Sequence, residues 1–398
     1  MSVLSRTPTM PLNSPVLSPK QVGSGMRAVP LKLLAGSVGP MFKKRKQSGE
    51  LAISGDNDVE DLRRQAIDLL YTKLMVDDEW SVRSDRGFSW WAYRLAQHVQ
   101  VGEPYRGPDG ATACDVRVWT DVATDFPPDE RKVTSMMGVV NAQETMNALV
   151  WNNRAGSIVE CCTSTIYADT VESWTDVLCT SAMIQNCAAH SRAHSVAEVL
   201  GGRVAASDHP TSGERPTMDD VLNVPVRLIA PEGAGPSRFA GRIMERLAAS
   251  DSPLSTVSPL FTGGAKSLTA EFPYSGAIRV ALAASGGSQP PETALLEVMT
   301  DQPHPEFGSG ALMVLRLPVS LAAHTGAIMA NELNLLESTT STGTNLLGAW
   351  CVPPDSSEDD DVAFISFVPS MLARGGVLEN LCLYFAARAS WAQSVLSD

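Results

Sequence analysis

The stretch NALVWNNRAGSIVECCTSTIYA, residues 147–168, decides the fold class of this chain. Its two runs NALVWN and SIVECCTSTIYA have the composition of strands, and the turn residues NRAG join them. Two strands joined by a short turn form an antiparallel pair. Helical patterns stand on both sides, over Asp129–Thr145 and Val171–Leu200. The stretch therefore predicts an α+β fold built on an antiparallel sheet.

The residues upstream complete one structural unit. An acidic start and apolar residues at helical spacing predict a helix from Asp56 to Leu74. Three strand candidates follow, with the turn YRGPDG before the last of them: EWSVR (79–83), WWAYRLAQHVQVG (90–102) and CDVRVWTDVATD (114–125). The unit reads helix, three strands, helix, two strands, helix.

The same order returns in the second half of the chain. A helix over Ser237–Ala249 precedes three strand candidates, LTAEFPY (268–274), AIRVALAA (277–284) and ALMVLRLPVSL (311–321). A helix over Ala322–Leu336, the strands LLGAWCV (346–352) and DVAFISFV (361–368), and a helix over Gly375–Leu396 complete the second unit. We align Trp151 with Trp350 and Ala188–Ala189 with Ala386–Ala387, and we infer an internal duplication.

Four segments follow from this duplication. Residues 1–55 are rich in Ser, Pro and Gly, lack periodicity and are expected to be disordered. Residues 56–203 and 237–398 form the two repeated domains, and the Gly- and Pro-rich residues 204–236 form a linker or strap between them. Each domain is predicted to be an antiparallel sheet with helices on one side, in the order α-β-β-β-α-β-β-α.

This order of elements resembles type III secretion chaperones and the YbjN family, together called TY-chaperone-like. The likeness rests on the strand that ends in Trp350, on AFISFVPSM (363–371) and on GGVLENLCLYFAARASWAQ (375–393), with Trp151 and SIVECCTSTIY in the first half. The resemblance implies a curved sheet with helices on one side, pairing as a dimer, and binding of polypeptides or no known activity. Two copies in one chain would form a covalent pseudo-dimer.

Composition limits the class of protein. The chain has 398 residues, 31 basic and 44 acidic, and its net charge of −13 argues against general affinity for nucleic acid or anionic lipid. The basic cluster FKKRK (42–46) is more commonly a solvated tail than a contact site. Seven cysteines, an odd count without a CxxC motif, indicate reduced thiols and a cytoplasmic protein. No apolar run has the length of a membrane span.

The segment NCAAHSRAH (186–194) raises the possibility of a metal site. Cys187, His190 and His194 fall on one helix face, and Cys161 or Cys162 on the preceding strand could supply a fourth ligand. No second ligand pair of zinc-finger type is present, and the aligned positions in the second half are Phe385, Arg388 and Ala392. The simpler interpretation is a helix face packed on the sheet, with no metal or other cofactor.

The tryptophans are the candidate partner-binding residues. Trp90 and Trp91 are adjacent and would point to opposite faces of a strand, so one can be core and the other can face a partner, although both can also be buried. Trp119 lies on the third strand candidate, with one face expected to be exposed. Trp side chains are enriched at binding hot spots.

Three functions remain open at this point. The chain lacks the GxSxG, HExxH and GxGxxG motifs, so we favour a non-enzymatic, cytoplasmic, chaperone-like protein that holds a polypeptide client. The alternatives are a metal- or thiol-dependent enzyme or sensor at Cys187, His190 and His194, and a structural subunit of a larger assembly. A homo-oligomer is compatible with all three.

Overall fold

A computed structural model describes residues 57–107, 110–223, 242–243, 245, 247, 262–263, 267–273, 293–304, 307–319, 323–339, 344–353 and 362–397. Contacts join residues 54–398 into one compact unit. Several predictions lie outside the described residues: the disordered segment 1–55, most of the helix over 237–249, and the strand AIRVALAA.

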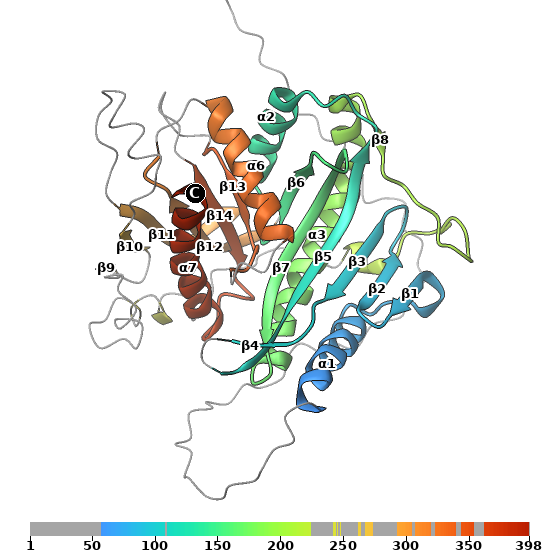
Figure 1. Cartoon of the computed structure of the whole chain (residues 1–398), viewed down its shortest axis with the longest axis horizontal. Coiled ribbons are helices and arrows are strands. Elements are labelled where there is room, and N and C mark those ends of the chain that lie inside the picture. Colours follow the sequence, from blue (N-terminus) through green and yellow to red (C-terminus); the bar gives the residue numbers. More distant parts are fainter. Residues whose placement is uncertain are drawn as a thin grey trace, which may run out of the picture. The chain divides into compact units, whose positions relative to one another are not determined.

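The first half forms one antiparallel sheet (Figure 1). Its strand order is β1 (Ser81–Ser84), β2 (Gly87–Trp91), β3 (Ala96–Val101), β5 (Thr112–Thr124), β7 (Ser157–Tyr167) and β6 (Ala148–Asn152), and the short strands β4 (Tyr105–Arg106) and β8 (Arg203–Val204) pair with β5. The hairpin predicted over residues 147–168 is confirmed as β6 and β7, paired from Asn152 with Ser157 to Ala148 with Cys161.

The second half forms a sheet with the same strand order. The sequence of strands is β13 (Ala349–Cys351), β14 (Ala363–Pro369), β12 (Gly308–Arg316), β11 (Thr293–His304), β10 (Ser267–Pro273) and β9 (Thr262–Gly263). The order β6-β7-β5-β3-β2-β1 thus corresponds, strand for strand, to β13-β14-β12-β11-β10-β9. The α+β class with antiparallel sheets is confirmed, and the matched order supports the inferred duplication.

The number of strands in each half was predicted wrongly. Five strands, β1 to β5, precede the middle helix of the first half, and four described strands, β9 to β12, precede that of the second, rather than three strands in each. WWAYRLAQHVQVG is not one strand, because the chain turns between Trp91 and Ala96. β11 was missed because TALLEVMTDQPH is rich in helix-forming residues, and its extended form is held by pairing with β10 and β12.

Two helices cover one face of the first sheet. α1 (Asn57–Lys73) buries Leu62, Ala66 and Leu70, which recur every four residues, and the long α3 (Val171–Leu200) lies against β5 and β7. Residues of β5 alternate, so that Val116 and Val118 enter this core and their neighbours point to the opposite face. This alternation positions the candidate site described below.

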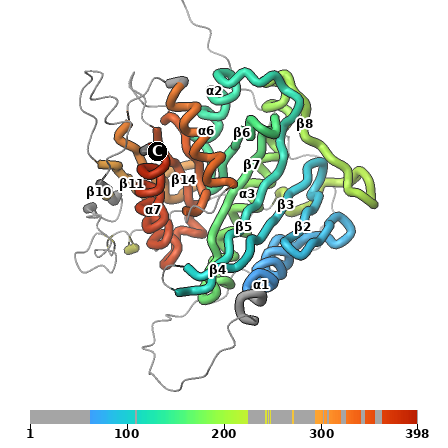
Figure 2. The backbone as a smooth tube through the Cα atoms, viewed as in Figure 1, coloured from blue at the N-terminus to red at the C-terminus, as the bar shows by residue number. Residues whose placement is uncertain are grey.

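The two halves exchange helix contacts across their meeting edges. The middle helices α2 (Glu130–Asn141) and α6 (Ala323–Thr339) pack together, α6 contacts β6 and β7, and α2 contacts β13. The tube in Figure 2 shows α6 beside α2 and β6. The last helix, α7 (Val377–Ser397), buries Leu378, Leu381 and Phe385 in the hydrophobic core that also contains Val116 and Val118 of β5.

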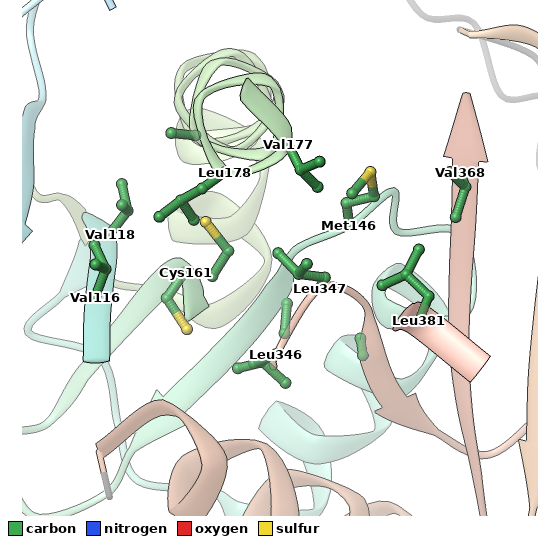
Figure 3. Close-up of a cluster of buried hydrophobic side chains, with 14 of the residues drawn as sticks. Val116, Val118, Met146, Cys161, Val177, Leu178, Leu346, Leu347, Val368 and Leu381 are labelled. Carbon is green, nitrogen blue, oxygen red and sulfur yellow. The ribbon is translucent and has the colours of Figure 1, made fainter. Parts of the chain in front are cut away.

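One hydrophobic core is shared by the two halves. In Figure 3, Leu346 and Leu347 of the second half lie among Cys161 and Val177 of the first half and Leu381 of α7. The backbone N–H of Thr163 donates to the carbonyl of Leu346 at 3.3 Å, so the second half continues the edge of β7 beyond β6. The domain bounds 56–203 and 237–398 stay predictions: apart from Val204 of β8, each sheet falls within one of them, but the core does not divide there.

The predicted strap is packed on the first sheet as far as it is described, to residue 223. Arg215 donates to the carbonyl of Trp91 at 2.6 Å and pairs with the carboxylates of Asp77 and Asp219. His209 packs its ring edge-on against Trp91, with centroids 4.9 Å apart. Among the described residues, no helix has both the length and the apolar character that crossing a membrane requires.

Candidate functional site

The face of the first sheet opposite α1 and α3 carries a continuous row of side chains. Register neighbours on β1, β2, β3, β5 and β7 form it: Val82, Ser89, His98, Trp119 and Cys161. Cys161 is fully buried near Ser338 of α6, whereas the His98 side chain is 26% exposed and Val82 is 42% exposed. We call Ser89, His98, Gln100, Arg117 and Trp119 the open face, since each is half-buried or exposed.

His98 is the centre of the hydrogen bonding on the open face. Its ring stacks on Trp119 with centroids 4.9 Å apart, and its Nδ1 lies 2.7 Å from Oγ of Ser89. Burial lowers the pKa of His98, and Arg117 lowers it further, while Asp121 opposes this shift. A neutral ring can accept the hydroxyl proton of Ser89 at Nδ1 and present N–H at Nε2.

Ser89, His98 and Asp121 have the composition of a catalytic triad but not its geometry. The closest Asp121 oxygen lies 3.8 Å from Nε2 of His98, which is beyond hydrogen-bond distance. β2 pairs with β1 on one side and β3 on the other, so the backbone N–H groups beside Ser89 belong to the sheet ladders. Such groups cannot form the oxyanion hole that acyl transfer needs. The arrangement suits recognition through stacking and hydrogen bonds.

A pocket of about 240 Å³ opens between the open face and the last turn of α6. Its polar lining includes Gln100, Asp115, Arg117, Thr163, Thr165 and Thr339. The side chain of Arg117 has no hydrogen bond or ion pair among the described residues: its Nε is buried without a partner, and its guanidinium lies 4.6 Å from the centre of the Trp119 ring. A guanidinium that is not paired with a carboxylate, in a polar pocket, favours an acidic ligand.

Two asparagine side chains give a precise alignment of the halves. Asn141 of α2 accepts the backbone N–H of Leu149 and donates to its carbonyl, both at 2.9 Å. Asn334 of α6 makes the same pair of bonds, also at 2.9 Å, to Trp350. These contacts place Leu149, and not Trp151, at the position of Trp350.

Buried ion pairs agree with this alignment. Glu144 lies three residues after Asn141 and pairs with Arg192 of α3, and Glu337 lies three residues after Asn334 and pairs with Arg388 of α7. Arg192 is thus the counterpart of Arg388, and the earlier match of His190 with Arg388 is corrected. A pattern of Asn followed three residues later by Glu, present as NAQE and NLLE, is the sequence signal that could have shown this.

The first half adds a second carboxylate to its ion pair. Glu160 lies opposite Leu149 on β7, is fully buried, and contacts Arg192 at 3.2 Å. Its counterpart opposite Trp350 is Phe364, whose ring lies 3.5 Å below the Arg388 guanidinium. Burial raises the pKa of Glu160 to about 8, although a hydrogen bond from Asn147 opposes the shift. One guanidinium therefore serves two buried carboxyl groups.

The predicted metal ligands are not brought together. Nδ1 of His190 bonds the carbonyl of Asn186 at 2.9 Å and its Nε2 accepts the N–H of Leu95 at 3.3 Å, so both ring nitrogens have backbone partners. The thiol of Cys187 donates to the carbonyl of Leu222, His194 is exposed, and Cys161 lies on the opposite face of the sheet. Within the described part of the chain, no cluster of three or more His, Cys, Asp or Glu could hold a metal ion.

Of the predicted tryptophan anchors, only Trp119 reaches the open face. Trp90 is buried and its Nε1 donates to Gln97, while Trp91 is buried and donates to Ser207 of the strap. His98 and Arg117 were missed as site residues. The alternation of polar and apolar residues in CDVRVWTD was the signal for Arg117, but nothing in the sequence pairs β3 with β5.

Comparison with known proteins identifies no relative: no family model, no curated protein and no solved structure matches this chain.

Proposed function

We propose that this protein is a non-enzymatic, chaperone-like binding protein that holds a segment of a partner polypeptide on the open face. The observation that carries the proposal is the half-exposed Trp119, stacked against His98 on one strand and contacted by the guanidinium of Arg117 on its own strand. A rigid aromatic ring surrounded by hydrogen-bonding groups is typical of the anchors in peptide and protein interfaces.

A polypeptide partner accounts for the whole face. Ser89, Gln100 and Arg117 supply donors and acceptors around the ring, and Trp119 supplies apolar area. At the outer edge of the sheet, β1 presents the exposed residues Val82 and Arg83. An edge strand can pair with an extended segment of a partner, so the sheet offers backbone pairing beside side-chain anchoring.

The covalent pseudo-dimer is part of the same proposal. The shared strand order and the exchanged contacts of α2 and α6 support the view that two TY-chaperone-like copies occupy the places of two subunits. No disulfide joins any of the seven cysteines, all of which lie in the described part of the chain, and burial raises the pKa of four of them to about 12. Both features support a reducing cytoplasmic setting.

The experiment is a selection from a displayed library of random peptides on the immobilised full chain. The affinity of each selected peptide is then measured by fluorescence anisotropy with the wild type, with Trp119→Ala and with Val139→Ala. Val139 is a control because it is 67% exposed on α2, outside the open face. Trp119→Ala is expected to weaken binding about thirtyfold or more, and Val139→Ala to leave it unchanged.

Two outcomes would overturn the proposal: a selection that yields no specific peptide, or selected peptides that bind Trp119→Ala as well as the wild type. In either case a purely structural role in an assembly becomes the better account, and light scattering on the purified chain would show whether it self-associates.

A further inference from the structure

The pocket at Arg117 has a counterpart in the second half, because the duplication supplies an equivalent for each of its residues. When Leu149 is aligned with Trp350, their register partners Glu160 and Phe364 also correspond. The registers of the next strands then give the equivalent residues across the rest of each sheet. The polar residues Gln100, Arg117 and Thr163 then correspond to Met299, Leu312 and Phe367. One row of the sheet face is polar in the first half and apolar in the second.

Apolar and ring side chains pack together at the counterpart positions of the second half. The rings of Phe307 and Phe367 both contact His304, with centroids 5.1 and 4.7 Å from it. Phe307 and Phe367 form one buried cluster with Ile184, and Leu312 packs against this cluster. Nε2 of His304 lies 3.2 Å from the hydroxyl of Thr145, four residues beyond the end of α2. In the first half the end of α6 borders the pocket of about 240 Å³ instead. An open polar pocket is therefore not a general consequence of this fold.

The charges lining the pocket select among acidic ligands. Asp115 is already engaged, since Oδ1 accepts the hydroxyls of Tyr105 at 3.0 Å and Thr165 at 2.7 Å. The Arg117 side chain has no hydrogen-bond or ion-pair partner among the described residues. One guanidinium and one carboxylate leave the lining close to neutral, and the chain carries −13 overall, so a dianion or a run of acidic residues would be repelled. A single carboxylate matches the planar fork of an arginine.

We propose that this pocket binds the side-chain carboxylate of an Asp or Glu in the partner polypeptide, with Arg117 as its ion-pair partner. This inference rests on the proposed function, because it names the residue class that lies next to Trp119. The pocket is smaller than the roughly 300 Å³ at which small-molecule sites begin, and it fits a side chain better than a whole metabolite. Gln100 and the hydroxyl of Thr163 line the same space as further polar contacts.

The test uses the peptides selected on the full chain. Acidic residues are expected to be enriched at one position of the selected sequences. Replacing that residue by its amide, Glu by Gln or Asp by Asn, is expected to weaken binding to the wild type about tenfold. The same replacement in the peptide should change its affinity for the Arg117→Leu variant less than about twofold, because this variant has no guanidinium to distinguish acid from amide. Leucine is chosen because Leu312 is the counterpart of Arg117 in the second half.

Two matched variants separate charge from shape. Arg117→Lys keeps the charge without the planar fork and should retain part of the preference for the acid. Arg203→Leu removes an arginine whose side chain is 79% exposed on β8, outside the open face, and should behave as the wild type. Far-ultraviolet circular dichroism checks that each variant is folded. The comparison of acid and amide peptides on the wild type does not depend on the folding of any variant.

The outcomes distinguish the two proposals. If no peptide binds, or if Trp119→Ala has no effect, the proposed function fails and this inference fails with it. If peptides bind through Trp119 but show no acidic position, or if Arg117→Leu still distinguishes acid from amide, only the carboxylate pocket is overturned. A peptide with phosphoserine in place of Glu should bind more weakly; tighter binding would overturn the assignment to a carboxylate.

Discussion

Asn331 of α6 bonds both backbone polar groups of Trp151 on β6, which belongs to the other half of the chain. The amide oxygen of Asn331 accepts the N–H of Trp151 at 3.0 Å, and its nitrogen donates to the carbonyl at 3.2 Å. Since β6 is the last strand of its sheet, these bonds replace the strand neighbour that Trp151 lacks. A helix of one half therefore completes the sheet edge of the other.

Asn331→Ala is expected to lower the free energy of unfolding by about 2–3 kcal/mol, because it leaves a buried N–H and a buried carbonyl unpaired. Urea unfolding followed by tryptophan fluorescence measures this loss. Glu332→Ala is the control, as Glu332 is the exposed next residue of the same helix and should change stability little. Equal stability of the two variants would contradict a structural role for the Asn331 bonds.

Arg388→Met is expected to cost about 3–5 kcal/mol, because it leaves the carboxylate of Glu337 buried without its guanidinium. Both side chains are 0% exposed, and their closest atoms are 2.9 Å apart. The double variant Arg388→Met with Glu337→Gln should lose less than Arg388→Met alone. Arg203→Met, which breaks an exposed ion pair with Asp125, should stay within about 0.5 kcal/mol of the wild type.

Glu160 should make the stability of the protein depend on pH. Burial raises its pKa from the ordinary 4.5 to about 8. Between these two values the unfolded chain releases this proton while the folded chain keeps it, so rising pH favours unfolding, and the loss is complete above the folded pKa. Glu160→Gln removes the titration. The urea concentration at the unfolding midpoint should therefore fall less between pH 5 and pH 8.5 in this variant than in the wild type. An equal fall in the two proteins would show that other groups cause it.

The cysteines should be almost unreactive in the folded protein. Six are buried, and burial raises the pKa of Cys162 and Cys179 to about 12. Cys187 is half-buried and is the one expected to react first with Ellman's reagent at pH 8. In guanidinium chloride all seven should react. Fast reaction of Cys161 or Cys162 in the native protein, or stoichiometric zinc lost in His190→Ala, would favour the metal or thiol alternative.

The sequence predicted most of the elements, because their signals are local. The hairpin over residues 147–168 follows from two strand-forming runs around a turn, and the predicted helix Val171–Leu200 is the observed α3. The extra strand in each half could not be predicted as easily. β11 has a helix-forming composition, and only its pairing on both sides holds it extended.

The candidate site was predicted only in part. The alternation in β5 puts Arg117 and Trp119 on one face, which the sequence alone determines. The sequence does not determine that His98 lies beside Trp119 or that α6 of the second half borders the pocket. Nor does it determine that Trp90 is buried with its Nε1 bonded to Gln97. Each of these depends on register or on contacts between segments far apart in the chain.

The candidate metal ligands Cys187, His190 and His194 show the same division. Helical spacing alone placed the three on one side of α3, but the backbone groups of Asn186, Leu95 and Leu222 decide what two of them bind. The sequence by itself determined the α+β class, the hairpin over residues 147–168 and the helix over residues 171–200, since periodicity and turn residues act locally. Tertiary structure alone decided which polar side chains are buried with partners and which, like the side chain of Arg117, have no hydrogen-bond partner among the described residues, because that depends on packing between distant segments.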